Sequence, residues 1–177
     1  MPAACSLFIL VEGPDDERFC KRILREHLRP KWRLNQVVPY AHENAEFVSR
    51  LVDAIKSGTG SDYVLMADRR PEPCVTAKRS ALLKRFRAIH QDRIIVVGIE
   101  IEAWYLAGLN KKNSAKLGVQ NYASTDNVTK EEFNAAIPRR FSSSRADWLL
   151  EILRIYSVQT AIGKNRSFAY FADKYLA

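Results

Sequence analysis

Acidic side chains directly follow three of the short apolar segments that have the length of β-strands. These residues are Glu12, Asp68 and the pair Glu100 and Glu102. Carboxylate oxygens are hard ligands, which Mg²⁺ and Mn²⁺ prefer in proteins. Carboxylates that gather at one place repel one another unless they are protonated or share a cation. The pattern therefore predicts a divalent-metal site formed by these four side chains.

Two alternatives stay open for these acids. Each one could simply begin a helix, because Asp and Glu are favourable in the first helical turn. Glu100 and Glu102 would lie about 200° apart around a helix axis, so only one of them could face the site. In a strand both would point to the same side of the sheet. We favour Glu102, which adjoins the helix that contains Trp104.

Basic residues are concentrated in the segment 69–93, which contains eight Lys or Arg and only two acids. Arg69 and Arg70 come directly after Asp68, at the predicted site. We expect Arg69, Arg70 and Lys78 to contact nucleic-acid phosphates, which Lys and Arg neutralise. A solvated helix face is the alternative, and it is favoured for the cations further along this segment.

The pattern of apolar residues predicts the elements that position these side chains. Strands are expected at Ser6–Val11, Arg33–Val38, Tyr63–Ala67 and Arg93–Ile99. Helices are expected at Asp15–Leu28, from about Glu43 to Ile55, and at Thr76–His90, Ile101–Leu109, Lys130–Ile137, Arg145–Tyr156 and Ser167–Leu176, with a polar stretch at Asn110–Thr129 and a cationic loop at 163–166. The alternation predicts an α/β fold with a mainly parallel four-stranded sheet flanked by helices. Ligand sites of such sheets lie beyond the carboxyl ends of the strands, where the acids fall.

This organisation predicts a core at residues 1–109 and a helical C-terminal part at 110–177 that packs on it. Aromatic residues in the helices of the second part have the spacing of core contacts.

Composition limits the class of protein. The chain has 177 residues, 47% of them hydrophobic, and a formal charge of 28 − 20 = +8. Disorder is excluded as the main state, and no apolar run approaches the roughly 18 residues of a membrane span. The N-terminal run is expected to be a strand and not a secretory signal. Cys5, Cys20 and Cys74 lack the paired spacing of a zinc site, which favours reduced, mostly buried thiols in a cytoplasmic protein.

Three sequence motifs resemble those of the Toprim superfamily. The first is 7–16, LFILVEGPDD, an apolar strand that ends in Glu-Gly with an acid three residues after the Gly. The second is 64–70, VLMADRR, similar to a strand that ends in Asp-x-Asp. The third is 99–106, IEIEAWYL, which looks like a helix start of the OLD-family nucleases. The chain resembles Toprim domains of topoisomerases, bacterial-type primases and OLD-family nucleases, and in particular small stand-alone Toprim-like proteins, over residues 5 to about 109.

The resemblance implies a Rossmann-like fold and Mg²⁺- or Mn²⁺-dependent hydrolysis of DNA or RNA. Glu12 would be the general acid/base or a metal contact. Asp68 and Glu102 would be metal ligands. Lys164 would be the late basic residue that OLD-like nucleases use.

One departure from the family pattern favours a different function. Arg70 stands where the second acid of Asp-x-Asp is expected, which replaces a ligand by a cation. Either Glu100 or Glu102 restores the number of ligands, or the chain is a non-catalytic nucleic-acid-binding or adaptor module. Such a module could partner an ABC-type ATPase or form a homodimer. A restriction-type nuclease is less favoured, because no Glu-x-Lys follows Asp68 at a suitable position.

Overall fold

The computed structural model describes residues 6–177, and these form two compact units. Within the described residues, unit 1 is 6–96 with Leu176, and unit 2 is 97–175 with Ala177. This division comes earlier in the chain than residue 109, so Glu100 and Glu102 belong to unit 2.

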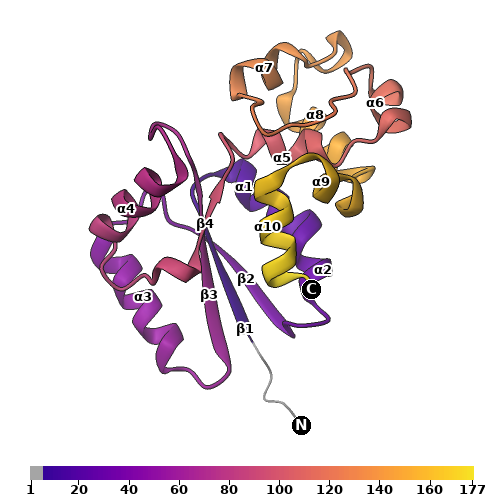
Figure 1. Cartoon of the computed structure of the whole chain (residues 1–177). Coiled ribbons are helices and arrows are strands. Elements are labelled where there is room, and N and C mark those ends of the chain that lie inside the picture. The colour runs from indigo at the N-terminus through magenta and orange to yellow at the C-terminus, as the bar shows by residue number, and fades with distance from the viewer. Residues whose placement is uncertain (1–5) are drawn as a thin grey trace. The chain divides into compact units, whose positions relative to one another are not determined.

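Unit 1 is built on a four-stranded sheet. Its strands are β1 (Ser6–Val11), β2 (Leu34–Pro39), β3 (Ser61–Asp68) and β4 (Ile94–Val97). They lie in the order β2-β1-β3-β4 and all run parallel (Figure 1). The predicted α/β class with a parallel four-stranded sheet is confirmed. Because β1 has β2 and β3 as neighbours, the carboxyl ends of these three strands meet at one edge.

Helices cover both faces of this sheet. They are α1 (Pro14–Phe19), the π-helical turn η1 (Cys20–Leu24), α2 (Arg25–Leu28), α3 (Ala45–Ser57), α4 (Val75–Arg85) and the 3₁₀ turn η2 (Gln91–Arg93). Figure 1 shows α3 and α4 on one side of the sheet and α1 and α2 on the other. The core on the α3–α4 side includes Leu10, Val48, Val52, Leu65, Leu82 and Phe86, all buried.

Several predicted elements of unit 1 differ from the observed ones at their ends, and three differences concern their conformation or length most. The helix expected at Asp15–Leu28 contains the π-helical turn η1. The helix expected at Thr76–His90 ends at Arg85, because Phe86 leaves the helical conformation with φ −120° and ψ 88° and is fully buried. The strand expected from Arg93 begins one residue later and ends at Val97.

Unit 2 is helical from Glu102 onward, which confirms the helical C-terminal part. Its elements are α5 (Glu102–Ala107), α6 (Lys111–Leu117), α7 (Lys130–Ala135), the 3₁₀ turn η3 (Arg139–Phe141), α8 (Arg145–Arg154), α9 (Val158–Lys164) and α10 (Arg166–Tyr175). The expected loop at 163–166 is wrong, because Gly163 and Lys164 complete α9. The Ser157 side chain caps the start of α9 by accepting a hydrogen bond from the Thr160 N–H at 3.2 Å.

Trp104 of α5 is at the centre of the aromatic core of unit 2. It is fully buried, and its ring centroid lies 5.0 Å from that of Phe168 and 5.6 Å from that of Phe171. Its indole N–H donates to Ser167 Oγ at 2.8 Å. The expected packing role of these helical aromatics is confirmed, since Trp148 and Tyr175 are buried as well.

Cysteine exposure differs in part from the expectation. Cys20 is a buried free thiol, whereas Cys74 is exposed. Cys5 lies outside the described residues. Over residues 6–177 the structure contains no helix with the length and apolar character that crossing a membrane requires.

Two glycines of unit 2 provide a test of this packing. A Cβ atom at Gly108 would lie 2.2 Å from Tyr156 Cε2, whereas one at Gly163 would meet no atom within 4 Å. The Tyr156 ring has little freedom to move, since its hydroxyl donates to the Trp104 carbonyl at 2.9 Å. We expect Gly108→Ala to lower the free energy of unfolding by about 1–3 kcal/mol. Gly163→Ala should raise it by about 0.5–1 kcal/mol, because Gly is unfavourable inside a helix.

Urea unfolding of both variants measures these effects. Equal changes in the two variants would contradict the packing around Gly108.

Candidate functional site

Glu12 and Asp68 meet at the carboxyl edge of the sheet in unit 1. Glu12 directly follows β1, and Asp68 is the last residue of the neighbouring β3. The Glu12 Oε2 atom accepts a hydrogen bond from the Asp68 N–H at 3.2 Å. The side chain of Glu12 is 27% exposed, so its carboxylate reaches solvent at this edge.

Lys78 of α4 provides the opposite charge for Glu12. Its Nζ lies 3.2 Å from Glu12 Oε1, 3.4 Å from the Arg70 carbonyl oxygen and 4.0 Å from Glu72 Oε2. Its side chain is only 9% exposed. Sequence reasoning placed Lys78 among the phosphate-binding cations, whereas the structure places it as the counter-ion of a carboxylate. The sequence feature that indicates this burial is helical spacing, because Lys78 precedes the buried Leu82 and Phe86 by four and eight residues.

Tyr40 is a third partner of Glu12 that sequence reasoning missed. It follows β2, the strand whose end carries no acid. Its hydroxyl lies 3.3 Å from Glu12 Oε1 and 3.1 Å from the Met66 carbonyl oxygen, close enough to donate to either. Burial, together with the negative charge of Glu12, raises the pKa of Tyr40 well above its usual range. The hydroxyl therefore stays protonated and acts as a donor to the Glu12 carboxylate.

Asp16, the second acid of the first motif, stabilises the turn that follows Glu12. It is buried, and its Oδ2 accepts a hydrogen bond from the Gly13 N–H at 3.2 Å. Pro14 occupies the first position of α1, where its missing N–H has no cost. This tight turn fixes the direction in which the chain leaves β1, and thereby the position of Glu12.

Arg69 and Arg70 form the loop that follows Asp68. Arg69 Nη1 donates to the Pro73 carbonyl at 2.7 Å, and this hydrogen bond joins the two ends of the loop. Arg70 is exposed, and its carbonyl oxygen accepts from Lys78. The structure thus places two guanidinium-bearing residues next to the Glu12 edge.

The donor chemistry of this edge suits a hard divalent cation. Mg²⁺ is commonly bound by one or two carboxylates and completes its shell with water and substrate phosphates. Glu12 and Asp68 supply two carboxylates, although Glu12 Oε1 is already held by Lys78. Across residues 6–177 there is no group of three or more His, Cys, Asp or Glu side chains arranged to hold a metal ion.

Glu102 is an ion-paired residue in the core of unit 2. It is the first residue of α5 and only 2% exposed. Its Oε1 accepts from Arg145 Nη2 at 2.7 Å and lies 3.8 Å from Lys130 Nζ. Burial raises the pKa of Glu102, and the two cations oppose this effect.

Glu100 also has a partner inside unit 2. Its Oε2 accepts a hydrogen bond from the Lys130 N–H at 2.7 Å, at the start of α7. The strand that precedes Glu100 ends at Val97, and the helix begins at Glu102. Neither of the two geometries considered for this pair is therefore present. Glu100 lies in the connecting turn, where it caps a neighbouring helix.

Lys164 closes a loop of unit 2. It is the last residue of α9, and its Nζ donates to the Leu109 carbonyl at 2.6 Å and to Asn121 Oδ1 at 2.9 Å. Burial lowers the pKa of its ammonium group. These contacts tie the polar segment after α5 to the end of α9.

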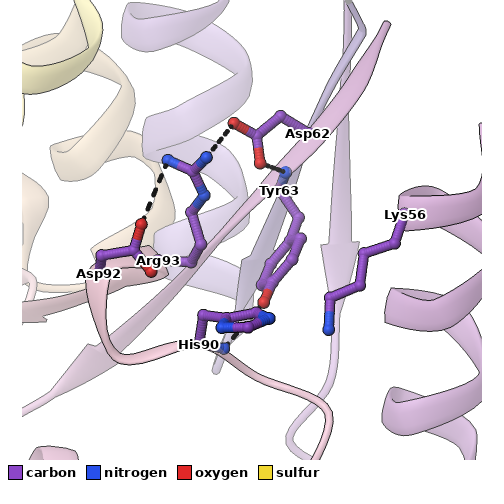
Figure 2. A pocket seen from close by; sticks show the side chains of 6 residues that line it. All are labelled: Lys56, Asp62, Tyr63, His90, Asp92 and Arg93. Atoms are coloured by element: carbon purple, nitrogen blue, oxygen red, sulfur yellow. Dashed lines mark hydrogen bonds and ion pairs between the residues drawn. The ribbon is translucent and has the colours of Figure 1, made fainter. Parts of the chain in front are cut away.

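A second polar site of unit 1 lies at the amino ends of β3 and β4, away from Glu12. It is a cleft of about 310 Å³, lined by Lys56, Asp62, Tyr63, His90, Asp92 and Arg93 (Figure 2). Arg93 bridges the two acids, at 3.0 Å from Asp62 and 3.8 Å from Asp92. The Tyr63 hydroxyl accepts from the His90 N–H at 2.9 Å. Most of the polar residues that line this cleft are ion-paired or hydrogen-bonded to one another.

The raised pKa of Glu102 predicts how the stability of the protein depends on pH. A carboxyl group whose pKa is higher in the folded state contributes stability that is fully present below its unfolded value, near 4.5, and is lost as the pH rises through the folded value. The free energy of unfolding of the wild type, minus that of Glu102→Gln, should therefore increase as the pH is lowered from about 7 towards 4.5.

Urea unfolding at several pH values measures this difference, with exposed Glu131→Gln as the control. A difference that decreases on acidification would mean that Arg145 and Lys130 outweigh burial.

Comparisons of the chain with known family models, with curated proteins and with solved structures found no match. The resemblance to Toprim domains therefore stays a prediction that depends on the three sequence motifs.

Proposed function

We propose that the Glu12 edge of unit 1 is a divalent-cation-dependent site that acts on nucleic-acid phosphodiesters, as in Toprim-type nucleases. The observation that carries this proposal is that Glu12 and Asp68 lie at the carboxyl ends of adjacent parallel strands, where the main-chain N–H of Asp68 donates to the Glu12 carboxylate at 3.2 Å. Ligand and catalytic sites of open parallel sheets occupy this edge. The adjacent Arg69 and Arg70 supply the positive charge that a phosphate backbone requires.

The residues of the edge have distinct roles in this proposal. Glu12 moves a proton at one of its carboxylate oxygens, and Tyr40 orients this carboxylate. Arg70, which is exposed, binds a phosphate oxygen of the substrate. When bound at Glu12 and Asp68, Mg²⁺ or Mn²⁺ would activate water and stabilise the leaving oxygen.

Substrate, partners and cellular location follow as parts of the same proposal. The substrate is DNA or RNA, and the net charge of +8 favours its approach. The chain acts in the cytoplasm, in keeping with free Cys20 and Cys74. An ABC-type ATPase or a second copy of the chain would be its partner.

A non-catalytic nucleic-acid-binding or adaptor module is the second candidate function. The observation that favours it is the ion pair of Lys78 with Glu12, which already neutralises the carboxylate. Arg70 in place of an acid points the same way, because it adds positive charge beside Asp68. In this case the edge would bind phosphate groups of the nucleic acid without cleaving its phosphodiester bonds.

Cleavage assays distinguish the two functions. We expect the purified protein to cut single- or double-stranded DNA or RNA with Mg²⁺ or Mn²⁺. Glu12→Gln should reduce the rate at least about 100-fold, the usual contribution of a general acid–base group. Asp68→Asn should also reduce it, because it removes the charge of a proposed metal ligand. The control is Glu46→Gln on α3, whose side chain is 76% exposed. Absence of cleavage by the wild type with either metal, combined with retained binding, would support the non-catalytic module.

Binding assays test the contribution of Arg70 to either function. Arg70→Gln should weaken binding to oligonucleotides of different sequence by a similar factor. It should also reduce the slope of log K against log [salt] by about one, as expected for one lost phosphate contact. Fluorescence anisotropy at several salt concentrations measures both effects. Arg50→Gln on α3, where Arg50 is 72% exposed, is the matched control and should leave the slope unchanged.

A further inference from the structure

The ammonium group of Lys78 occupies a pocket of oxygen atoms at the Glu12 edge. Three oxygens lie within 4.0 Å of Nζ, namely one from each of Glu12, Arg70 and Glu72. Two of them belong to carboxylates and one to a main-chain carbonyl. Carboxylate and carbonyl oxygens are also the ligands of hard divalent cations. The chain therefore fills a cation-type environment with a cation of its own.

Burial keeps Lys78 in this position. A lysine with a side chain only 9% exposed has lost most of its hydration and must be paired. Its place in α4, one and two turns before the buried Leu82 and Phe86, directs its stem towards the core. The ammonium is thus held by the fold of unit 1.

A divalent cation and this ammonium group cannot both use Glu12 Oε1. The Lys78 Nζ already lies 3.2 Å from this oxygen, and Mg²⁺ approaches a ligand oxygen to about 2.1 Å. Two cations on one oxygen repel each other strongly where water is partly excluded. Binding of the metal at Oε1 therefore requires Lys78 to leave this oxygen, and the other carboxylate oxygen, Oε2, already accepts a hydrogen bond from the Asp68 N–H at 3.2 Å.

We propose that Lys78 is a built-in competitor of the divalent cation and that it sets the affinity of the Glu12 site for metal. This inference rests on the proposed metal-dependent function and describes how that same site is regulated. With Lys78 on Glu12 the site binds metal weakly. Removal of the ammonium group opens the carboxylate to the metal.

Direct Mn²⁺ binding to the full-length chain tests this proposal without a measurement of activity. Isothermal titration calorimetry and the electron paramagnetic resonance signal of free Mn²⁺ give the dissociation constant. Lys78→Met keeps the length of the side chain and removes its charge, and Lys78→Gln is a second neutral variant. Lys84→Met, an exposed lysine of the same helix, controls for the general loss of one positive charge. Thermal unfolding monitored by circular dichroism identifies the variants that fold.

The expected result is that Lys78→Met or Lys78→Gln binds Mn²⁺ at least tenfold more tightly than the wild type does. Lys84→Met should bind as the wild type does. Addition of Glu12→Gln to the Lys78 variant should remove the gain.

Two other results would overturn the competition and are distinguishable from each other. If the wild type binds Mn²⁺ through Glu12 and the Lys78 variants bind equally or more weakly, the competition is wrong and the metal site stands. If neither the wild type nor the Lys78 variants show binding that Glu12→Gln removes, the metal site of the proposed function is wrong as well.

Discussion

The geometry of unit 1 depends on how the negative charge of Glu12 is satisfied where three parallel strands end. A carboxylate that is largely removed from water needs donors or a cation, since its desolvation is costly. The Asp68 N–H at the end of β3, Tyr40 after β2 and Lys78 of α4 supply them. Because β1 lies between β2 and β3, a residue that follows β1 can take partners from the ends of both of these strands. The strand order therefore brings Tyr40 and the Asp68 N–H to Glu12.

The buried carboxylate of unit 2, Glu102, has a different environment from that of Glu12. Glu102 is 2% exposed and is paired with Arg145 at 2.7 Å, so its carboxylate is enclosed within unit 2. The side chain of Glu12 is 27% exposed and keeps access to solvent. A ligand can therefore reach the Glu12 carboxylate, whereas the Glu102 carboxylate is enclosed by its own partners. Exposure, more than charge, separates the candidate functional acid from the structural one.

Apolar periodicity was sufficient to predict the sheet and most helices, because burial determines both. The positions of Glu12 and Asp68 at strand ends followed from the same pattern. The role of Lys78 did not, since it was expected to contact nucleic-acid phosphate, although its spacing from Leu82 places it on the buried face of α4. Lys164 was expected in a cationic loop at 163–166, yet the cap at Ser157 and the buried Ala161 allow α9 to continue through it. Partners that are distant in sequence, such as Tyr40, are determined by topology and not by local pattern.

Arg70, which stands where the Toprim motif that the chain resembles has an Asp, and Lys78 have a common electrostatic effect. An Asp at position 70 would carry one negative charge, so Arg70 changes the local charge by two units, which equals the charge of one divalent cation. Lys78 adds a further positive charge directly on Glu12. Side chains of this edge thus supply positive charge that a bound metal ion would otherwise supply. In the non-catalytic module this positive charge replaces the metal permanently. In the metal-dependent function it yields to the metal, and only that function requires Lys78 to move.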